Sequence, residues 1–152
     1  MQETKSLNSL AFSATVHCLT GCAIGEVAGM VIGTALDWSN GATIAISIAL
    51  AFLFGYSFTS LPLLRAGLAV SAVIPLALAS DTISIGIMEI VDNTVVALIP
   101  GALDAGLGDI AFWASLALAL VLAGMAAYPA NRWLLARGKG HAVVHEHHHA
   151  HQ

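Results

Sequence analysis

Four long apolar segments, separated by short polar breaks, make up most of the chain. We place them at about residues 9–35, 42–58, 68–99 and 110–128. A helix needs about 20 predominantly apolar residues to cross the hydrocarbon core of a bilayer, and three of the segments approach or exceed that length. The pattern therefore predicts an all-α membrane protein, a four-helix transmembrane bundle whose membrane domain covers residues 9–131.

The breaks between the segments carry ordinary stop signals. The residues DWSN end the first segment, and SLPLLRAG, which contains Pro62 and Arg65, links the second segment to the third. Pro75 lies early in the third segment, where a proline can kink a helix. Pro100 and Gly101 then end that segment.

The basic residues all fall on one side of this arrangement. They precede the first segment, lie between the second and third, and follow the fourth: Lys5, Arg65, Arg132, Arg137 and Lys139. Because cytoplasmic loops collect Lys and Arg, we expect both termini to be cytoplasmic. Residues 1–8 would then be a cytoplasmic lead-in, and residues 132–152 a cytoplasmic tail.

Composition supports a membrane domain and excludes several functions. Of 152 residues, 58% are hydrophobic and 9% are charged, and the mean hydropathy is +0.85. A soluble domain of this size would carry far more charge on its surface. The formal charge of −4 and the lack of a basic stripe argue against nucleic acid as a partner. We expect the lipid bilayer to surround the chain.

A weak internal similarity raises a hypothesis about the architecture. The heptapeptide VIGTALD (31–37) resembles LIPGALD (98–104), and a Glu precedes each of them. The chain could consist of two parallel-related helical hairpins, an arrangement found in transporters with the site between the halves. Chance similarity in a chain rich in Ala, Leu and Ile is the alternative.

Polar side chains gather on one half of the first segment. At 100° per residue, Cys22, Glu26 and Met30 lie at about 40°, 80° and 120° from Cys18. The same half carries a row of glycines, Gly21, Gly25, Gly29 and Gly33. Such a row lets another helix approach closely, either within the bundle or in a homo-oligomer. His17 lies off this stripe, and we expect it to point away.

The third segment carries a matching stripe. On a helix, Asp81, Met88, Glu89, Asp92 and Asn93 share about 140° of one face. Acids within a membrane are costly and face the protein interior or a water-filled cavity. No Lys or Arg lies within any segment to neutralise them. We expect protons, bound cations or hydrogen-bond donors to compensate for the buried negative charge. At least one acid among Glu26, Asp81, Glu89 and Asp92 should be protonated near neutral pH.

The two stripes together indicate a metal site. Carboxylate and amide oxygens alone suit Mg²⁺, Ca²⁺, Na⁺ or protons, whereas thiols and thioethers favour Cu(I) or Zn²⁺. We therefore predict a transition-metal ion, copper or zinc, with ligands drawn from Cys18, Cys22, Glu26, Met30, Asp81, Met88, Glu89, Asp92 and Asn93. The tail adds six further histidines that can capture metal: His141, His145, His147, His148, His149 and His151.

Three stretches also carry a resemblance to a known family. HCLTGCAIGE in the first segment, SDTISIGIMEIVDN in the third, and YPANRWLLARGKGHAVV before the tail resemble a family of small bacterial integral membrane proteins, catalogued as domain of unknown function 4396. The resemblance implies a four-helix, multi-pass domain in a bacterial inner membrane. It implies no activity, so it assigns a role to no residue.

The leading hypothesis is a membrane protein that binds or translocates a transition-metal cation, with possible linkage to protons. Such a path would need a homo-oligomer packed on the glycine face and could use a metal-handling partner protein. We do not predict an enzyme. The one enzymatic alternative is a membrane thiol-redox protein using Cys18 and Cys22, although an i, i+4 pair meets disulfide geometry poorly. A structural or assembly subunit is the third possibility.

Overall fold

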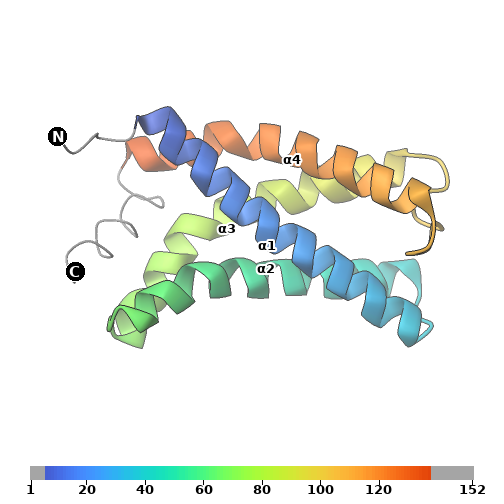
Figure 1. Cartoon of the computed structure of the whole chain (residues 1–152), viewed down its shortest axis with the longest axis horizontal. Helices are drawn as coiled ribbons and strands as arrows, with labels where there is room; N and C mark the ends of the chain where they lie inside the picture. Colours follow the sequence, from blue (N-terminus) through green and yellow to red (C-terminus); the bar gives the residue numbers. More distant parts are fainter. Residues whose placement is uncertain (1–5, 138–152) are drawn as a thin grey trace.

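The computed structural model describes residues 6–137, and four α-helices account for nearly all of them (Figure 1). These are α1 (Leu7–Ala35), α2 (Asn40–Arg65), α3 (Val70–Leu98) and α4 (Ile110–Ala136). The described part of the chain contains no β-strand. The predicted all-α, four-helix architecture is confirmed.

All four helices are long and apolar enough to cross a membrane. They contain 26 to 29 residues, or about 39–44 Å at 1.5 Å per residue, which exceeds a hydrocarbon core of about 30 Å. Large apolar side chains cover the outside of the bundle, such as Phe12, Leu53, Ile90 and Met125. A surface of this kind suits lipid, so the chain is a multi-pass membrane protein.

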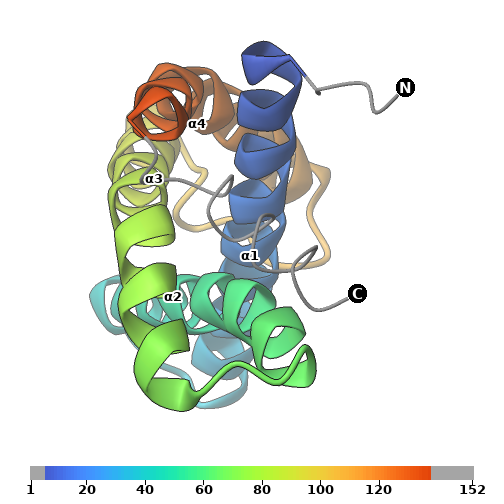
Figure 2. The ribbon, with the colours of Figure 1, turned by 90° about the vertical axis from the view of Figure 1, so that its left-hand side faces the viewer.

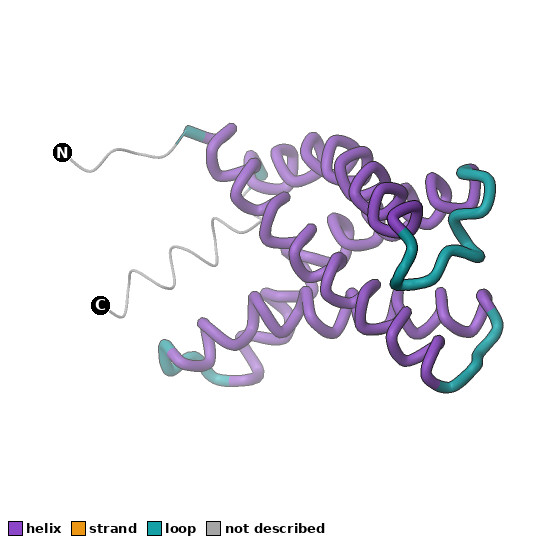
Figure 3. The backbone as a smooth tube through the Cα atoms, turned by 45° about the vertical axis from the view of Figure 1, so that its right-hand side comes forward, coloured by secondary structure: helices purple, strands orange, loops and turns teal. Residues whose placement is uncertain are grey.

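The helices form a closed ring, with closer contact across one diagonal than across the other. Each helix packs against the next along the chain, α4 returns to α1, and the diagonal pair α1 and α3 also meet (Figure 2). The start of α1, the α2–α3 turn and the end of α4 lie at one end of the bundle, called here the termini end. The α1–α2 turn and residues 99–109 lie at the other, the loop end (Figure 3). Helices α1 and α3 therefore run in the same direction.

The second helix is longer than the predicted segment 42–58. It continues through Pro62 to Arg65, where a link was expected. Pro62 lacks the backbone N–H that would bond the Phe58 carbonyl, and its ring crowds that group, so other contacts must support the helix beyond it. The extension also buries Leu63, which packs against Val73 of α3. That contact accounts for helix where the sequence pattern predicts a loop.

Two further boundaries differ from the prediction. Helix α1 begins at Leu7, within the expected lead-in 1–8, because the Ser6 hydroxyl caps it by accepting a hydrogen bond from the Ser9 amide at 3.2 Å. Helix α4 continues past Pro129 into the expected tail, since Leu134 and Leu135 are buried. The remainder of the lead-in and the tail, with its six histidines, lie outside the described residues.

The other limits agree with the expected segments. Helix α3 spans nearly the predicted 68–99 and runs without interruption through Pro75. It ends just before Pro100, and Gly101 adopts a φ of 78°, a left-handed conformation that favours glycine. The DWSN turn likewise contains Asp37 at a φ of 53°. Both loop-end connections are therefore built from residues suited to sharp reversals.

The glycine row of α1 packs against α2 of the same chain. All four glycines are buried. A methyl group at Gly21 would come within 2.9 Å of the Gly55 Cα, and one at Gly25 would overlap the backbone of Ala51. Further along, the row faces small polar residues of α2, Ser47 at Gly29 and Thr43 at Gly33. We call this contact the glycine seam.

The glycine seam corrects one expectation. Because α2 fills the glycine face, a second copy of the chain cannot pack there, as the homo-oligomer hypothesis required. Small residues at a helix contact let the backbones approach, and here both sides of the contact belong to one hairpin. Assembly into an oligomer stays a prediction and would need another surface.

Candidate functional site

The polar stripes of α1 and α3 face each other in the interior of the bundle. Cys18, Cys22 and Glu26 follow one another at intervals of one helical turn along α1, about 6 Å each. Each meets a different part of α3, and all three are buried. We call this stack of three contacts the polar ladder.

The level nearest the termini end joins Cys18 to Asp81. The thiol sulfur lies 4.0 Å from Asp81 Oδ1, and Asp81 is fully buried. The hydroxyl of Thr59 on α2 hydrogen-bonds the same carboxyl group. Thr59 Oγ1 also lies 3.4 Å from His17 Nε2. The side chains of three helices therefore meet around this acid.

His17 is thus part of the ladder's surroundings, which corrects the expectation that it points away. Its ring lies between α1 and α2, partly buried, with an edge contact to Phe58 at 6.0 Å between ring centroids. The angular argument considered α1 alone and placed His17 off the stripe. Thr59 supplies the link, since α2 brings its hydroxyl between the imidazole and Asp81.

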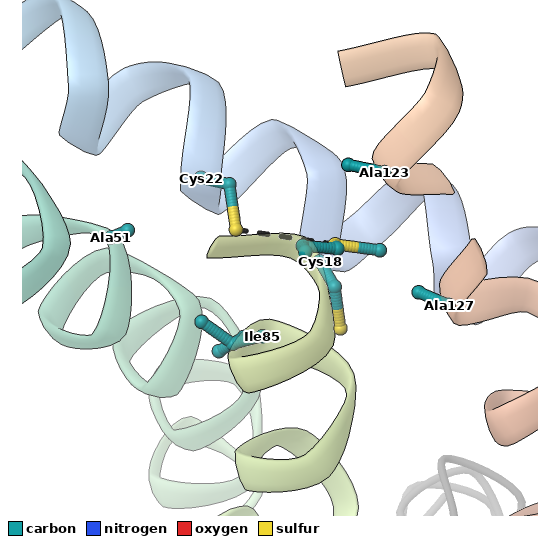
Figure 4. Packing of buried hydrophobic residues seen from close by; sticks show 7 residues of the cluster. Cys18, Cys22, Ala51, Ile85, Ala123 and Ala127 are labelled. Carbon is teal, nitrogen blue, oxygen red and sulfur yellow. Dashed lines mark hydrogen bonds between the residues drawn. The ribbon is translucent and has the colours of Figure 1, made fainter. Parts of the chain in front are cut away.

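The middle level brings two sulfur atoms together. Cys22 Sγ lies 3.9 Å from Met88 Sδ, the contact drawn as a dashed line in Figure 4. Both side chains belong to an apolar cluster with Ala51 of α2 and Ala123 of α4. The carboxyl group of Glu89 lies beside the Cys22 thiol. This level is therefore a sulfur pair in an apolar surrounding, with one acid next to it.

The level nearest the loop end pairs two acids. The carboxyl groups of Glu26 and Asp92 are close enough to share a hydrogen bond. A hydrogen bond between two carboxyl groups requires one proton between them. Beside this pair, the Asn93 amide donates to the backbone oxygen of Glu89 at 2.9 Å and to its Oε2 at 3.4 Å.

Several polar atoms of the ladder lack a hydrogen-bond partner among the described residues. They are Glu26 Oε1, Glu89 Oε1 and Asp92 Oδ1. Burying such an atom without a partner costs roughly 1–3 kcal/mol. Among the described residues of the four helices, the basic side chains are Arg65 of α2 and Arg132 of α4. Both lie close to the termini end, so neither accompanies the acids of the ladder. The arrangement is therefore expensive as packing alone.

A cavity adjoins the third level at the loop end. Its volume is about 70 Å³, counted as the space open to the centre of a water molecule. On that scale one water needs about 10–15 Å³. Glu26, Asp92 and Asn93 contribute to its wall, as does Met30. Residues from all four helices complete the lining, together with Ala102 and Leu103 of the 99–109 connection.

The structure divides the predicted ligand set rather than gathering it into one site. Met30 lines the cavity, and Cys18 with Asp81 forms a level separate from Cys22 and Met88. Among residues 6–137, no group of three or more His, Cys, Asp or Glu side chains is arranged to hold a metal ion. A metal site in this part of the chain would therefore need other ligands as well, such as a thioether, an amide or hydroxyl oxygen, or water. The ligand roles stay predictions.

Sequence reasoning missed the contribution of the other two helices. Thr59 and Ser47 of α2, and Ser115 and Asn131 of α4, are all buried polar residues. Thr59 belongs to the first level, and Ser47 and Ser115 line the cavity. Ser47 and Ser115 interrupt otherwise apolar runs, which is a weak signal, whereas Thr59 and Asn131 lie just beyond the predicted segments.

Comparison with protein families identifies one match. The family model described as "Domain of unknown function (DUF4396)" matches residues 8–140. The chain belongs to this family. No curated protein and no solved structure matches the chain. The match covers α1 from its second residue and all of α2 to α4, so the polar ladder, the glycine seam and the cavity all lie within the DUF4396 domain, whose description names no activity.

Proposed function

We propose that this DUF4396 chain binds a soft transition-metal cation, Cu(I), between α1 and α3 and moves it along the polar ladder. The observation that carries the proposal is the 3.9 Å separation of Cys22 Sγ and Met88 Sδ. Two sulfurs, each about 2.3 Å from one ion, lie about 3.8–4.6 Å apart at angles from tetrahedral to linear. The sulfur pair thus already has a separation suited to a shared ion.

The ligand types favour Cu(I) over Zn²⁺. A thiolate with a thioether is a soft ligand pair, the kind that selects Cu(I). Structural Zn²⁺ takes four ligands, and catalytic Zn²⁺ takes three with a water. The described residues offer no group of three His, Cys, Asp or Glu for it. Binding requires Cys22 to lose its proton, and the neighbouring Glu89 carboxylate is placed to accept it.

Movement of the ion is the less direct part of the proposal. The three levels of the ladder, with Met30 in the cavity beyond them, form a series of sulfur and carboxyl groups about one turn apart. An ion could pass from the loop end toward Cys18 by exchanging one set of ligands for the next. With no nucleotide-binding motif in the sequence, such movement would be passive, ion-coupled or driven by a partner protein.

The test is anaerobic Cu(I) titration of the full-length protein in mild detergent, against a colorimetric Cu(I) chelator. To separate the core from the tail, every variant carries glutamine in place of the six tail histidines: His141→Gln, His145→Gln, His147→Gln, His148→Gln, His149→Gln and His151→Gln. We expect one Cu(I) per chain. Cys22→Ser and Met88→Leu each remove a direct ligand and should weaken binding by at least about a hundredfold, since loss of an outer-shell partner alone costs about 10–100-fold.

The chain offers a matched control for each change. Met125→Leu alters a thioether that is 68% exposed on the outside of α4 and should leave binding unchanged. Cys18→Ser removes the other thiol and should have a smaller effect than Cys22→Ser. Absence of stoichiometric Cu(I), or equal losses from Met88→Leu and Met125→Leu, would rule out the sulfur pair as the site.

For the membrane, we propose the bacterial inner membrane with the termini end in the cytoplasm, as the distribution of Lys and Arg favours. Single cysteines at Ser39 and Gly108, both exposed at the loop end, test this orientation. A membrane-impermeant maleimide should label both from outside intact cells, while the buried Cys18 and Cys22 stay unreactive. Labelling at Arg137→Cys instead would reverse the orientation.

A further inference from the structure

The cavity at the loop end differs chemically from the sulfur pair. Its polar lining consists of oxygen and amide groups, which come from α1, α2, α3 and α4: Glu26, Asn40, Thr43, Ser47, Asp92, Asn93 and Ser115. Met30 supplies the one sulfur in the wall, and no His, Lys or Arg is among the described lining residues. The remaining wall is apolar. A lining of this kind suits a hard cation or water rather than Cu(I).

Two acids of the wall carry unpartnered oxygens. Glu26 is 8% exposed and Asp92 is 3% exposed, so both are more than nine-tenths buried. Glu26 Oε1 and Asp92 Oδ1 have no hydrogen-bond partner among the described residues. The two carboxyl groups lie side by side across α1 and α3. The cavity wall therefore contains two neighbouring carboxyl groups, each with one buried acceptor oxygen that has no donor among the described residues.

The amide of Asn93 is oriented in a way that adds a third oxygen. Its nitrogen donates to Glu89, at 2.9 Å to the backbone oxygen and 3.4 Å to Oε2. This leaves the amide oxygen available as an acceptor in the cavity wall. The Ser47 and Ser115 hydroxyls, each 7% exposed, are further oxygen ligands within the same lining.

Size and charge then select the ion. Once the proton shared by Glu26 and Asp92 is released, the two carboxylates carry a charge of −2, with no basic residue in the described lining, and a divalent cation neutralises that charge. The cavity volume of about 70 Å³ has room for about five to seven waters, since each needs about 10–15 Å³ on the same scale. Mg²⁺ keeps several of its waters and binds proteins through one or two carboxylates. The volume of the cavity and the pair of acids both suit this mode of Mg²⁺ coordination.

We propose that this cavity binds a partly hydrated divalent cation of the Mg²⁺ class, held by the carboxylates of Glu26 and Asp92. The 99–109 connection lies over the site, since Ala102 and Leu103 are in its wall and Asn40 donates to Asp104 at 3.4 Å. This site stands independently of the proposed Cu(I) site, one turn deeper at Cys22.

Mn²⁺ serves as the spectroscopic probe, because it shares the ligand preference of Mg²⁺ and its free aqua ion gives an EPR signal that disappears on binding. Full-length protein with glutamine at the six tail histidines is titrated with Mn²⁺ in mild detergent. We expect one Mn²⁺ per chain, displaced by excess Mg²⁺. Glu26→Gln and Asp92→Asn keep the side-chain volume and should each weaken binding at least about tenfold.

Two further variants keep the test sharp. Asp37→Asn changes an exposed acid at the same end, at a backbone conformation that Asn tolerates, and should leave binding unchanged. Ser115→Leu fills the cavity without altering a carboxylate and should also displace Mn²⁺. Circular dichroism and size-exclusion elution that match the parent protein establish that each variant is folded.

The outcomes separate the two proposed sites. Loss of Mn²⁺ binding in the cavity variants with retention in Cys22→Ser supports a distinct hard-cation site, whether or not Cu(I) binds. No stoichiometric Mn²⁺, no competition by Mg²⁺, full binding in Asp92→Asn, or an equal loss in Asp37→Asn would each overturn the proposal. In the last case the ion is held by surface charge at the loop end.

Discussion

Two faces of one helix, α1, are built on opposite principles. The glycine seam joins α1 to α2 through glycines and small residues, with backbones so close that a methyl group at Gly25 would overlap Ala51. The polar ladder joins α1 to α3 through thiols, a thioether and acids, and it leaves acceptor oxygens of Glu26, Glu89 and Asp92 without partners among the described residues. One contact is closed, and the other keeps unsatisfied groups and a cavity.

The difference indicates that the stability of the bundle accounts for the glycine seam but not for the polar ladder. In lipid, helices associate through close van der Waals packing, which the seam provides along four turns of α1. A bundle held together by that seam has no structural need for buried acids opposite it. Departures from good packing and hydrogen bonding concentrate at functional sites. The ladder is therefore the face on which we locate function.

The largest expected effect breaks the seam. Gly25→Ala places a methyl group against the backbone of Ala51, which cannot move without displacing α2. We expect a loss of about 3 kcal/mol in the free energy of unfolding, the upper end for overpacking. Gly86→Ala is the matched control, since a methyl group there meets nothing within 4 Å. The control should gain about 0.5–1 kcal/mol from helix propensity.

Unfolding with SDS in mixed micelles, followed by circular dichroism, measures both changes. The same result also tests whether the seam is the main support of the hairpin. If Gly25→Ala and Gly86→Ala shift the transition equally, the close α1–α2 contact contributes little, and the comparison between the faces fails.

The second effect has the opposite sign and concerns the ladder. Asp92→Asn replaces one of two adjacent acids with an amide that can donate to Glu26, while Asp92 Oδ1 has no partner among the described residues. We expect metal-free protein to gain about 1–2 kcal/mol, because an unpartnered buried acceptor costs about that much. Destabilisation by Asp92→Asn in the same SDS assay would show that the acid is needed for packing.

The sequence predicts those features of the fold and of the site that depend on a single segment of the chain. Four apolar segments predict four helices, and the angular positions of Cys22 and Glu26 on one helix predict a buried stripe. Both are properties of a single segment. The glycine row likewise predicts a close contact, but nothing in α1 states whether its partner is α2 or another chain.

Contacts between helices could not be predicted in this way, because they join residues far apart in the sequence. The place of His17 depends on Thr59, which is 42 residues further along and reaches it only once α2 folds back. The separation of the ladder into levels follows from the axial register of α1 against α3. The loops and the glycine seam together determine that register. Helix ends also shifted where tertiary contacts outweighed a proline, as at Leu63 after Pro62.

The smallest expected effect lies at the termini end, where a buried polar contact is fully satisfied and so contrasts with the ladder. Thr15 Oγ1 donates to the Ala11 carbonyl oxygen at 2.8 Å and accepts from Asn131 Nδ2 at 2.9 Å, joining α1 to α4. Thr15→Val leaves the Asn131 amide, which is 2% exposed, without this acceptor. We expect a loss of about 1 kcal/mol, near the values for hydrogen bonds between membrane helices.

A double-mutant cycle with Asn131→Leu isolates that hydrogen bond, and its coupling energy should be about 0.6 kcal/mol. The exposed contact nearby is the control: Arg132 Nε donates to Asn8 Oδ1 at 2.8 Å between the same two helices. Asn8→Ala should change stability by less than about 0.5 kcal/mol, because solvent replaces the lost partner. Equal effects at the buried and exposed contacts would mean that water reaches Thr15 and Asn131. The termini end would then be open as well, and the polar ladder would be accessible from both ends of the bundle.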